Sequence, residues 1–396
     1  MRLWHRGCSL YKIVMDSHGV NPKRRGAGPL TIARIWGIPI SVHVSWLLVF
    51  ALVAGSLAGG HFRELHPEWG AATRWALGAL TSLVFFACIL AHELGHSRVA
   101  MRNGIPIRRI TLFVFGGVAQ ISREAASPAV EFRIAIAGPL TSLGLAGLFA
   151  GIGAAAGSVA VVGVPALWLA RINLAVALFN LLPGFPLDGG RVLRAAVWAW
   201  TGSFERSDRA ASRAGEALAL ALIGFGVLRA LGGDVAGGIW MALIGWFLQS
   251  AVVAGRAEAA LRALLRGATV SQAMGHECVS VAPGLTLDRL VQEEVLGAGR
   301  RCFVVAEDGH LRGLLTLHEV KGVPRERWDR VTVEEIMRPA PTLAAVRPDD
   351  DLLQALGKMD DASVAQMPVV ADGQWLGMLD REHIVHYMRA RAELGV

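Results

Sequence analysis

The sequence predicts a polytopic α-helical membrane protein with about six transmembrane helices, followed by a soluble C-terminal α/β domain. Hydrophobic residues make up 53% of the 396 residues, and the mean hydropathy of +0.45 exceeds that of an ordinary soluble domain. Apolar runs of about 20 residues, long enough to cross a bilayer, stop after residue 256. Residues 268–396 instead carry 14 basic and 20 acidic side chains, a net charge of −6.

Charge bias orients the apolar segments. By length, these segments lie approximately at residues 38–57, 75–101, 129–157, 164–182, 214–231 and 236–255. The connection at residues 98–133 contains six arginines and that at residues 191–213 contains five, whereas the opposite connections carry few basic residues. By the positive-inside rule the arginine-rich side is cytoplasmic. We therefore expect a multi-pass protein of the cell (inner) membrane with both termini in the cytoplasm.

The pentapeptide His92-Glu93-Leu94-Gly95-His96 lies inside the second apolar segment. On a helix, a spacing of four brings the two imidazoles onto one face, one turn apart, with Glu93 beside them. A zinc hydrolase needs such a ligand pair, a base, a third protein ligand and an open position for water. Although the short pattern also occurs by chance, ionisable groups are costly in hydrocarbon and usually mark functional sites there. We predict that both histidines bind a metal.

Asp188 is the best candidate for the third ligand. It follows an apolar run and lies in a segment, residues 180–191, that contains several prolines and glycines. Proline removes a backbone donor and glycine permits unusual torsions, so we expect the helix to unwind here and turn a carboxylate inward. Taken alone, Asp188 could equally be a residue of a surface loop.

These two motifs, together with three further stretches, resemble the site-2 protease family of intramembrane zinc metalloproteases. The further stretches are residues 37–46, 115–119 and 137–139. The resemblance implies that His92, His96 and Asp188 bind one Zn²⁺ and that Glu93 is the catalytic acid/base. It also implies that the substrates are membrane-anchored regulators, such as anti-sigma or transcription factors, after a first cut has removed their outer portion.

The expected mechanism is hydrolysis of a peptide bond within a transmembrane segment. Zinc activates water, Glu93 accepts its proton, the hydroxide attacks the peptide carbonyl, and Glu93 returns the proton to the leaving amine. A nearby donor would stabilise the oxyanion. Asn180, in an otherwise apolar helix, is our candidate for that donor, and a hydrogen bond between helices is its alternative role.

Three further sequence features bear on the site. Residues 110–121 are strand-like around a glycine pair and could form either a hairpin whose edge pairs with an unwound substrate or a hairpin that packs internally. His43 could line the active-site cavity or be a satisfied core histidine, and the resemblance assigns it no zinc. Where the family usually has Asn after Gly138-Pro139, this chain has Thr141-Ser142, so no role of that Asn is transferred.

The soluble domain contains an internal repeat with a period of 63–65 residues. Residues 270–274 recur as 333–337, and residues 302–305 recur as 367–370. Short β-rich runs alternate with helical stretches, which indicates two copies of a small α/β unit. The repeat resembles a tandem CBS domain, a module that members of the site-2 protease family commonly append and that often senses adenine nucleotides.

This chain departs from the nucleotide signature of CBS domains in both copies. The signature places Ser or Thr and then Asp after the glycine-led strand, but here Thr316 is followed by Glu319, and Asp380 by His383. A carboxylate at Asp380 would repel phosphate unless cations intervene. An adenine nucleotide at the CBS pair and a purely structural or dimerising pair, which would give a homodimer, both stay open.

These patterns divide the chain into three parts. They are a basic cytoplasmic tail at residues 1–35, a transmembrane zinc metalloprotease domain at 36–257 and a cytoplasmic tandem CBS domain at 258–396, with repeats at about 268–330 and 331–396. The tail has seven Lys or Arg but no continuous apolar core or cleavage site, so we expect no cleavable signal. It could contact anionic lipid or be disordered. The cysteines lie far apart in the sequence and indicate reduced thiols rather than a disulfide framework: Cys8, Cys88, Cys278 and Cys302.

Two other functional classes compete with the protease. A divalent-metal transporter with a regulatory module would also place His and Asp in the membrane. Glu93 argues against it, because transport needs ligands that release metal and does not need a base beside two imidazoles. A catalytically inactive scaffold acting through its CBS pair comes third. The partners we expect are a membrane-anchored protein substrate and the lipid bilayer, and no nucleic acid.

Overall fold

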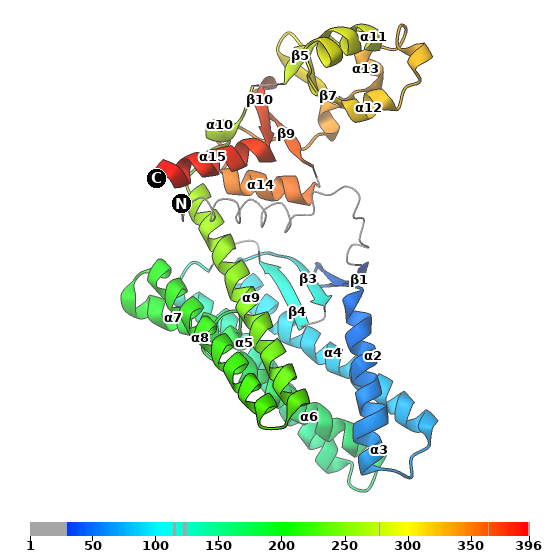
Figure 1. Cartoon of the computed structure of the whole chain (residues 1–396), viewed down its shortest axis with the longest axis vertical. Helices are drawn as coiled ribbons and strands as arrows, with labels where there is room; N and C mark the ends of the chain where they lie inside the picture. The colour runs from blue at the N-terminus through cyan, green and yellow to red at the C-terminus, as the bar shows by residue number, and fades with distance from the viewer. Residues whose placement is uncertain (1–29, 114–115, 122–124, 277, 363, 395–396) are drawn as a thin grey trace. The chain divides into compact units, whose positions relative to one another are not determined.

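The computed structural model describes residues 30–113, 116–121, 125–276, 278–362 and 364–394 (Figure 1). These residues form two compact units, one within residues 23–256 and the other from residue 257 onwards. Most of the predicted basic tail, residues 1–29, lies outside the described residues.

The first unit, called the membrane unit below, contains six helical segments long and apolar enough to cross a membrane among the described residues, which confirms the predicted fold class. The first segment, Ser45–Leu65, consists of α2 (Ser45–Ser56), a π-helical turn η1 (Leu57–His61) and α3 (Phe62–Leu65). The others are α4 (Ala71–Arg102), α5 (Pro128–Ala155), α6 (Ala160–Asn180), α8 (Phe204–Leu231) and α9 (Val235–Leu265). The last turns of α9, from residue 257 onwards, belong to the second unit. The shorter α7 (Asp188–Thr201) lies between α6 and α8 in the chain.

The predicted start of the first span was wrong. Ile38–Val42 forms strand β2, and the helix begins only at Ser45. An apolar run does not by itself distinguish a buried strand from a helix, and the β-branched residues of this one favour a strand. The fifth span was predicted to begin at residue 214 but begins at Phe204, because its first turns are polar and hydropathy does not detect them.

A four-stranded sheet accompanies these helices (Figure 1). Its strands are β1 (Leu30–Ile35), β2 (Ile38–Val42), β3 (Ile107–Phe113) and β4 (Gly116–Ile121), in the spatial order β1-β2-β3-β4. β1 and β2 form a tight hairpin in which Trp36 and Gly37 have φ of 52° and 82°, as a two-residue type I′ turn requires. β2 is parallel to β3, and β3 is antiparallel to β4, which confirms the hairpin predicted at residues 110–121.

The sheet packs on the helix that carries the histidine motif. Ile38, Ile40 and Ile110 are buried, and Leu90 and Leu94 of α4 pack against them. On its other side α4 packs against α5, which also contacts α6 and α7. The helices α4 and α5 come close because Gly95 has no side chain: a Cβ there would lie 2.5 Å from Thr141 Oγ1. The sheet and α5 therefore enclose the part of α4 that carries the motif.

The second unit, called the CBS unit below, contains the predicted pair of α/β repeats. Its strands are β5 (Val279–Val281), β6 (Cys302–Glu307), β7 (His310–Thr316), β8 (Arg338–Pro339), β9 (Gln366–Ala371) and β10 (Gln374–Asp380). Its helical elements are α10 (Val270–Ala273), α11 (Leu287–Arg289), η2 (Leu290–Gly297), α12 (Leu317–Lys321), η3 (Arg325–Arg327), α13 (Val333–Ile336), η4 (Ala340–Thr342), α14 (Leu352–Asp361) and α15 (Arg381–Leu394).

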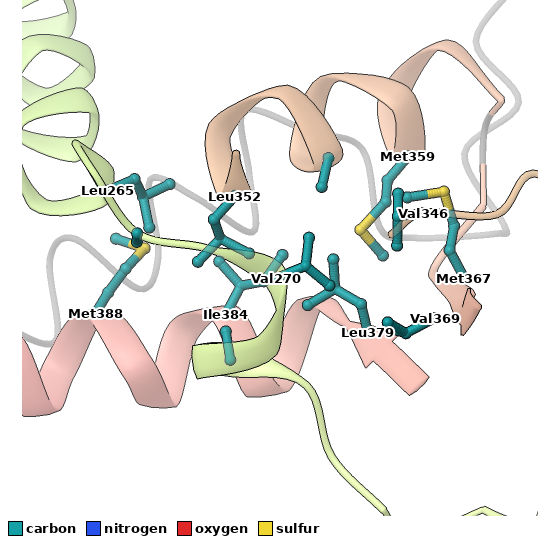
Figure 2. Packing of buried hydrophobic residues seen from close by; sticks show 13 residues of the cluster. Leu265, Val270, Val346, Leu352, Met359, Met367, Val369, Leu379, Ile384 and Met388 are labelled. Atoms are coloured by element: carbon teal, nitrogen blue, oxygen red, sulfur yellow. The ribbon is translucent and has the colours of Figure 1, made fainter. Parts of the chain in front are cut away.

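The two repeats pair through their hairpins. The strand order is β5-β6-β7-β10-β9, with β8 beside β7, so the hairpin β6-β7 of the first repeat adjoins β9-β10 of the second. Both hairpins turn at an Asp-Gly pair with positive φ, Asp308-Gly309 and Asp372-Gly373, as type I′ turns require. The unit has two apolar cores, and each takes residues from both repeats: Val270 and Ala273 pack into the core of the second repeat, and Val331 and Val333 into that of the first. Figure 2 shows the core of the second repeat, where Leu352 and Met359 of α14 face Leu379 and Ile384.

Candidate metal centre

His92 and His96 lie one turn apart on α4, as the four-residue spacing predicts. Both are buried, with 5% and 6% of their surface exposed. Their rings are nearly perpendicular, at 78°, with centroids 4.9 Å apart. The two Nε2 atoms are 3.2 Å from each other, so they point at one small volume.

Asp188 reaches the same volume from the first turn of α7. The chain leaves helical geometry after Asn180 and resumes it at Asp188, as the prolines and glycines of this segment predict. Glycine is required where α7 begins, because a Cβ on Gly189 would lie 2.3 Å from the carbonyl oxygens of both Leu181 and Leu182. The unwound segment is thus packed tightly against the start of α7, and this fixes the position of the carboxylate.

The three side chains form a compact donor set. Asp188 Oδ2 lies 3.0 Å from His92 Nε2 and 3.2 Å from His96 Nε2. Among the described residues, these three are the one group of metal-binding side chains that converges in this way. Ligand bonds of about 2.0–2.2 Å in tetrahedral geometry place donor atoms about 3.3 Å apart. Two imidazoles and one carboxylate at these separations therefore fit a zinc ion and leave its fourth position open.

The other ring nitrogen of each histidine has its own partner. His96 Nδ1 is 2.7 Å from the carbonyl oxygen of Ile134, to which it donates, and His92 Nδ1 is 2.9 Å from Ser142 Oγ. An imidazole that donates through Nδ1 presents the Nε2 lone pair to a metal. Both partners come from α5, and sequence reasoning missed them. Ser142 stands in the very stretch where the chain departs from the family pattern.

Gly138 forms the wall of the site opposite the ligands. A Cβ at this position would lie 2.2 Å from His96 Nε2 and 2.6 Å from His92 Nε2. The backbone of α5 therefore approaches the metal-facing nitrogens as closely as a glycine allows. This close approach explains why residue 138 is a glycine.

Glu93 is half-buried beside the histidine pair and lies under strand β4. A Cβ on Gly117 of β4 would be 2.5 Å from Glu93 Cγ and 3.3 Å from Glu93 Oε1. Among the described residues β4 pairs with β3 alone, at one end of the sheet. Strand β4, which has a free outer edge among the described residues, therefore lies next to the Glu93 carboxylate beside the candidate metal-binding triad.

A buried ion network holds α7 in place behind Asp188. Glu131 of α5 is 2% exposed and accepts hydrogen bonds from Arg191 Nε at 2.9 Å and Arg194 NH2 at 2.6 Å. Arg194 also pairs with Asp208 of α8 at 3.1 Å. Arg191 lies one turn after Asp188 on the same helix, so the network fixes the helix that carries the third ligand. The sequence drew no attention to Glu131.

The structure does not bring two other candidate residues into the triad. The amide of Asn180 donates to Val176 O, 3.1 Å away on its own helix, and its role as oxyanion donor stays a prediction. His43 is exposed rather than a core histidine, and its Nδ1 lies 2.8 Å from Ser45 Oγ at the start of α2.

Known proteins share this organisation. A model of Peptidase family M50 matches residues 80–161 and 152–222, and a CBS domain model matches residues 333–390. A candidate zinc metalloprotease of Synechocystis sp. is 34% identical over 373 residues, which cover 92% of this chain and 96% of that protein. The chain belongs to peptidase family M50, the site-2 protease family.

Further members of the site-2 protease family align over most of the chain. A candidate zinc metalloprotease of Mycobacterium tuberculosis is 36% identical over 359 residues, 87% of this chain and 88% of that protein. A solved structure, the site-2 protease from Methanocaldococcus jannaschii, is 27% identical with a TM-score of 0.40 and covers 57% of this chain and 94% of that one. Family membership makes the chain a multi-pass membrane zinc metalloprotease with a C-terminal CBS unit.

Proposed function

We propose that the protein hydrolyses peptide bonds within or near the transmembrane segments of membrane-anchored regulatory proteins, with one Zn²⁺ held by His92, His96 and Asp188. The convergence of Nε2, Nε2 and Oδ2 within 3.0–3.2 Å of one another carries this proposal. When bound there, zinc supplies a Lewis acid that polarises water and the peptide carbonyl. The histidine protons held at Nδ1 keep both Nε2 atoms available to it.

Glu93 moves the proton. Its carboxylate lies next to the histidine pair, where it accepts a proton from the attacking water and then passes that proton to the nitrogen of the leaving amine. The packing of Gly117 against Glu93 Cγ limits where the carboxylate can swing. As the donor for the oxyanion we keep Asn180, whose amide nitrogen has a second N–H besides the one that bonds Val176 O.

Strand β4 is the element that would hold the substrate. A helical substrate shields its own scissile amide, and pairing with a strand edge keeps a peptide extended with its carbonyl carbon accessible. The edge of β4 that faces away from β3 has no partner strand among the residues described. Because Gly117 touches Glu93, a peptide paired there would lie within reach of the proton acceptor.

Replacing Gly117 with alanine tests this placement. The new Cβ would lie 2.5 Å from Glu93 Cγ, and because Cγ is near the root of the side chain, the carboxylate must shift. A displacement of this size should lower kcat by about 10²-fold, with zinc content unchanged. Gly59→Ala, where an added Cβ has no atom within 4 Å, is the control. Equal kcat for both variants would show that Gly117 of β4 does not lie against the catalytic carboxylate.

The proposed function itself is tested with Glu93→Gln in the full-length protein. We expect one zinc per chain in both forms and a loss of about 10²–10⁴-fold in cleavage of a single-span membrane reporter, because the proton acceptor is gone while the ligands stay. Glu64→Gln, an exposed residue of α3, controls for removal of a charge. Zinc-loaded Glu93→Gln that cleaves at the original rate would refute the mechanism. Zinc flux into vesicles that survives this substitution would favour the transporter instead.

The remaining parts of the proposal concern location and the CBS unit. We place the protein in the cell membrane with the arginine-rich connections and both termini in the cytoplasm. The side chains at which the chain departs from the nucleotide signature cap helices. Thr316 hydrogen-bonds Glu319 at the start of α12, and Asp380 Oδ1 accepts a hydrogen bond from His383 N at 2.7 Å. These caps favour a structural role for the pair over nucleotide recognition, and homodimerisation stays a prediction.

A further inference from the structure

Two thiols face each other at the start of adjacent strands in the CBS unit. Cys302 is the first residue of β6, and Cys278 immediately precedes β5. The strands are parallel, with Val279 opposite Phe303, so the same register sets Cys278 opposite Cys302. Adjacent strands lie about 4.8 Å apart, within the Cα separation of about 4.4–6.8 Å that disulfides span.

The side chains are also in contact. The Cys278 thiol hydrogen-bonds the Cys302 sulfur, and both residues are half-buried, reduced and packed against the same apolar cluster. Gln366, the first residue of β9 in the second repeat, donates through Nε2 to Cys302 Sγ at 3.5 Å. The sequence does not indicate this pair, because the two cysteines lie far apart along the chain. In the structure they lie where the two repeats meet.

Hydrogen bonds favour the thiolate form of Cys302. The hydrogen bonds from Cys278 and Gln366 hold its pKa below the usual value for a thiol, although burial and the charge of Asp380 act in the opposite direction. The thiolate is the form that attacks an oxidant, and a half-buried sulfur is open to a small one. Cysteine pairs of this kind in reducing compartments are usually transient redox sensors.

We propose that Cys278 and Cys302 form a reversible dithiol–disulfide switch, with hydrogen peroxide as oxidant and a dithiol as reductant. The Cys302 thiolate attacks the peroxide, the O–O bond breaks, and one oxygen passes to sulfur as a sulfenic acid while the other leaves as water. The Cys278 thiol then attacks that sulfur, the S–S bond forms, and the second oxygen leaves as water. Two electrons pass from the thiols to the peroxide, and both thiol protons end in water.

The switch acts at the contact between the repeats and is independent of peptide hydrolysis. Oxidation ties the start of β5 to β6 and removes the thiolate that Gln366 contacts. The apolar cluster around the two sulfurs includes Met378 and Trp375 of β10. A change in the first repeat therefore reaches the second through side chains already in contact.

The test uses the full-length protein in detergent, treated with hydrogen peroxide, alkylated and digested with trypsin. Cleavage after Arg266, Arg289, Arg301 and Arg312 gives peptides 267–289 and 302–312, each with one cysteine. We expect these two peptides to appear as one linked species lacking two hydrogens, and dithiothreitol to restore both. Cys278→Ser and Cys302→Ser should each abolish the link, whereas Cys88→Ser, in α4 of the membrane unit, should retain it.

Several results would overturn the switch. Full alkylation of both thiols after peroxide treatment would show that the two sulfurs do not form a bond. Cys302 oxidised alone, or joined to Cys8, to Cys88 or to a second chain, would equally contradict it. The linked-peptide result on the unmodified protein decides the question even if one serine variant fails to fold.

Discussion

Gly138→Ala is expected to abolish zinc binding and peptide cleavage together. The added methyl group would lie 2.2 Å from His96 Nε2 and 2.6 Å from His92 Nε2, far inside van der Waals contact. Those nitrogens cannot retreat freely, because each ring is also held through Nδ1 by α5. Metal ligands must keep their distances within about 0.2 Å, so displacement of the rings removes the site.

The measurement is zinc per chain after dialysis, with reporter cleavage by the same sample. Gly144→Ala is the matched control, because it makes the same substitution on α5 where no atom lies within 4 Å of the new Cβ. It should keep full zinc and activity and gain slightly in helix stability, by up to about 1 kcal/mol. A Gly138→Ala protein with one zinc and normal cleavage would show that the metal does not sit between these nitrogens.

Glu131→Gln is expected to destabilise the membrane unit by about 3–5 kcal/mol, the usual cost of removing one partner from a buried ion pair. Glu131 is 2% exposed and compensates the guanidinium groups of both Arg191 and Arg194. A neutral amide leaves those charges in a poorly solvated position. Because Arg191 lies one turn after Asp188, α7 should also shift and weaken zinc binding.

Unfolding in detergent and zinc affinity are to be measured on the same variant. Glu216→Gln provides the comparison, because Glu216 pairs with Arg256 at 2.6 Å but both side chains are more than a third exposed. Exposed pairs contribute about 0–1 kcal/mol, so this substitution should change neither the stability nor the zinc affinity by more than that. Equal stability of the two variants would mean that the Glu131 network does not support α7.

The convergence of the three candidate ligands could be predicted because its signals are local. His92 and His96 share a helix face through a four-residue spacing, and the prolines and glycines before Asp188 mark the end of α6. The remaining parts of the site depend on packing between distant segments. Ser142 lies 50 residues from His92, and Glu131 lies 60 residues from Arg191.

The misplaced elements have a similar cause. The run beginning at Ile38 is apolar whether it forms a strand or a helix, and its pairing with β3, far along the chain, decides for the strand. Likewise, Cys278 and Cys302 are close because of the register of β5 on β6. No spacing in the sequence predicts that register. Composition gave the fold class, whereas these contacts required the tertiary structure.

The outer edge of β4 has a consequence for substrate choice. Under the proposed function, an edge that pairs with the main chain would select transmembrane segments by how readily they leave the helical state rather than by side-chain identity, because amides and carbonyls are the same in every peptide. Glycine weakens a helix by about 1 kcal/mol and proline by about 3 kcal/mol relative to alanine. Segments with such residues near the depth of Glu93 would be cut first, and uninterrupted leucine-rich anchors would be spared.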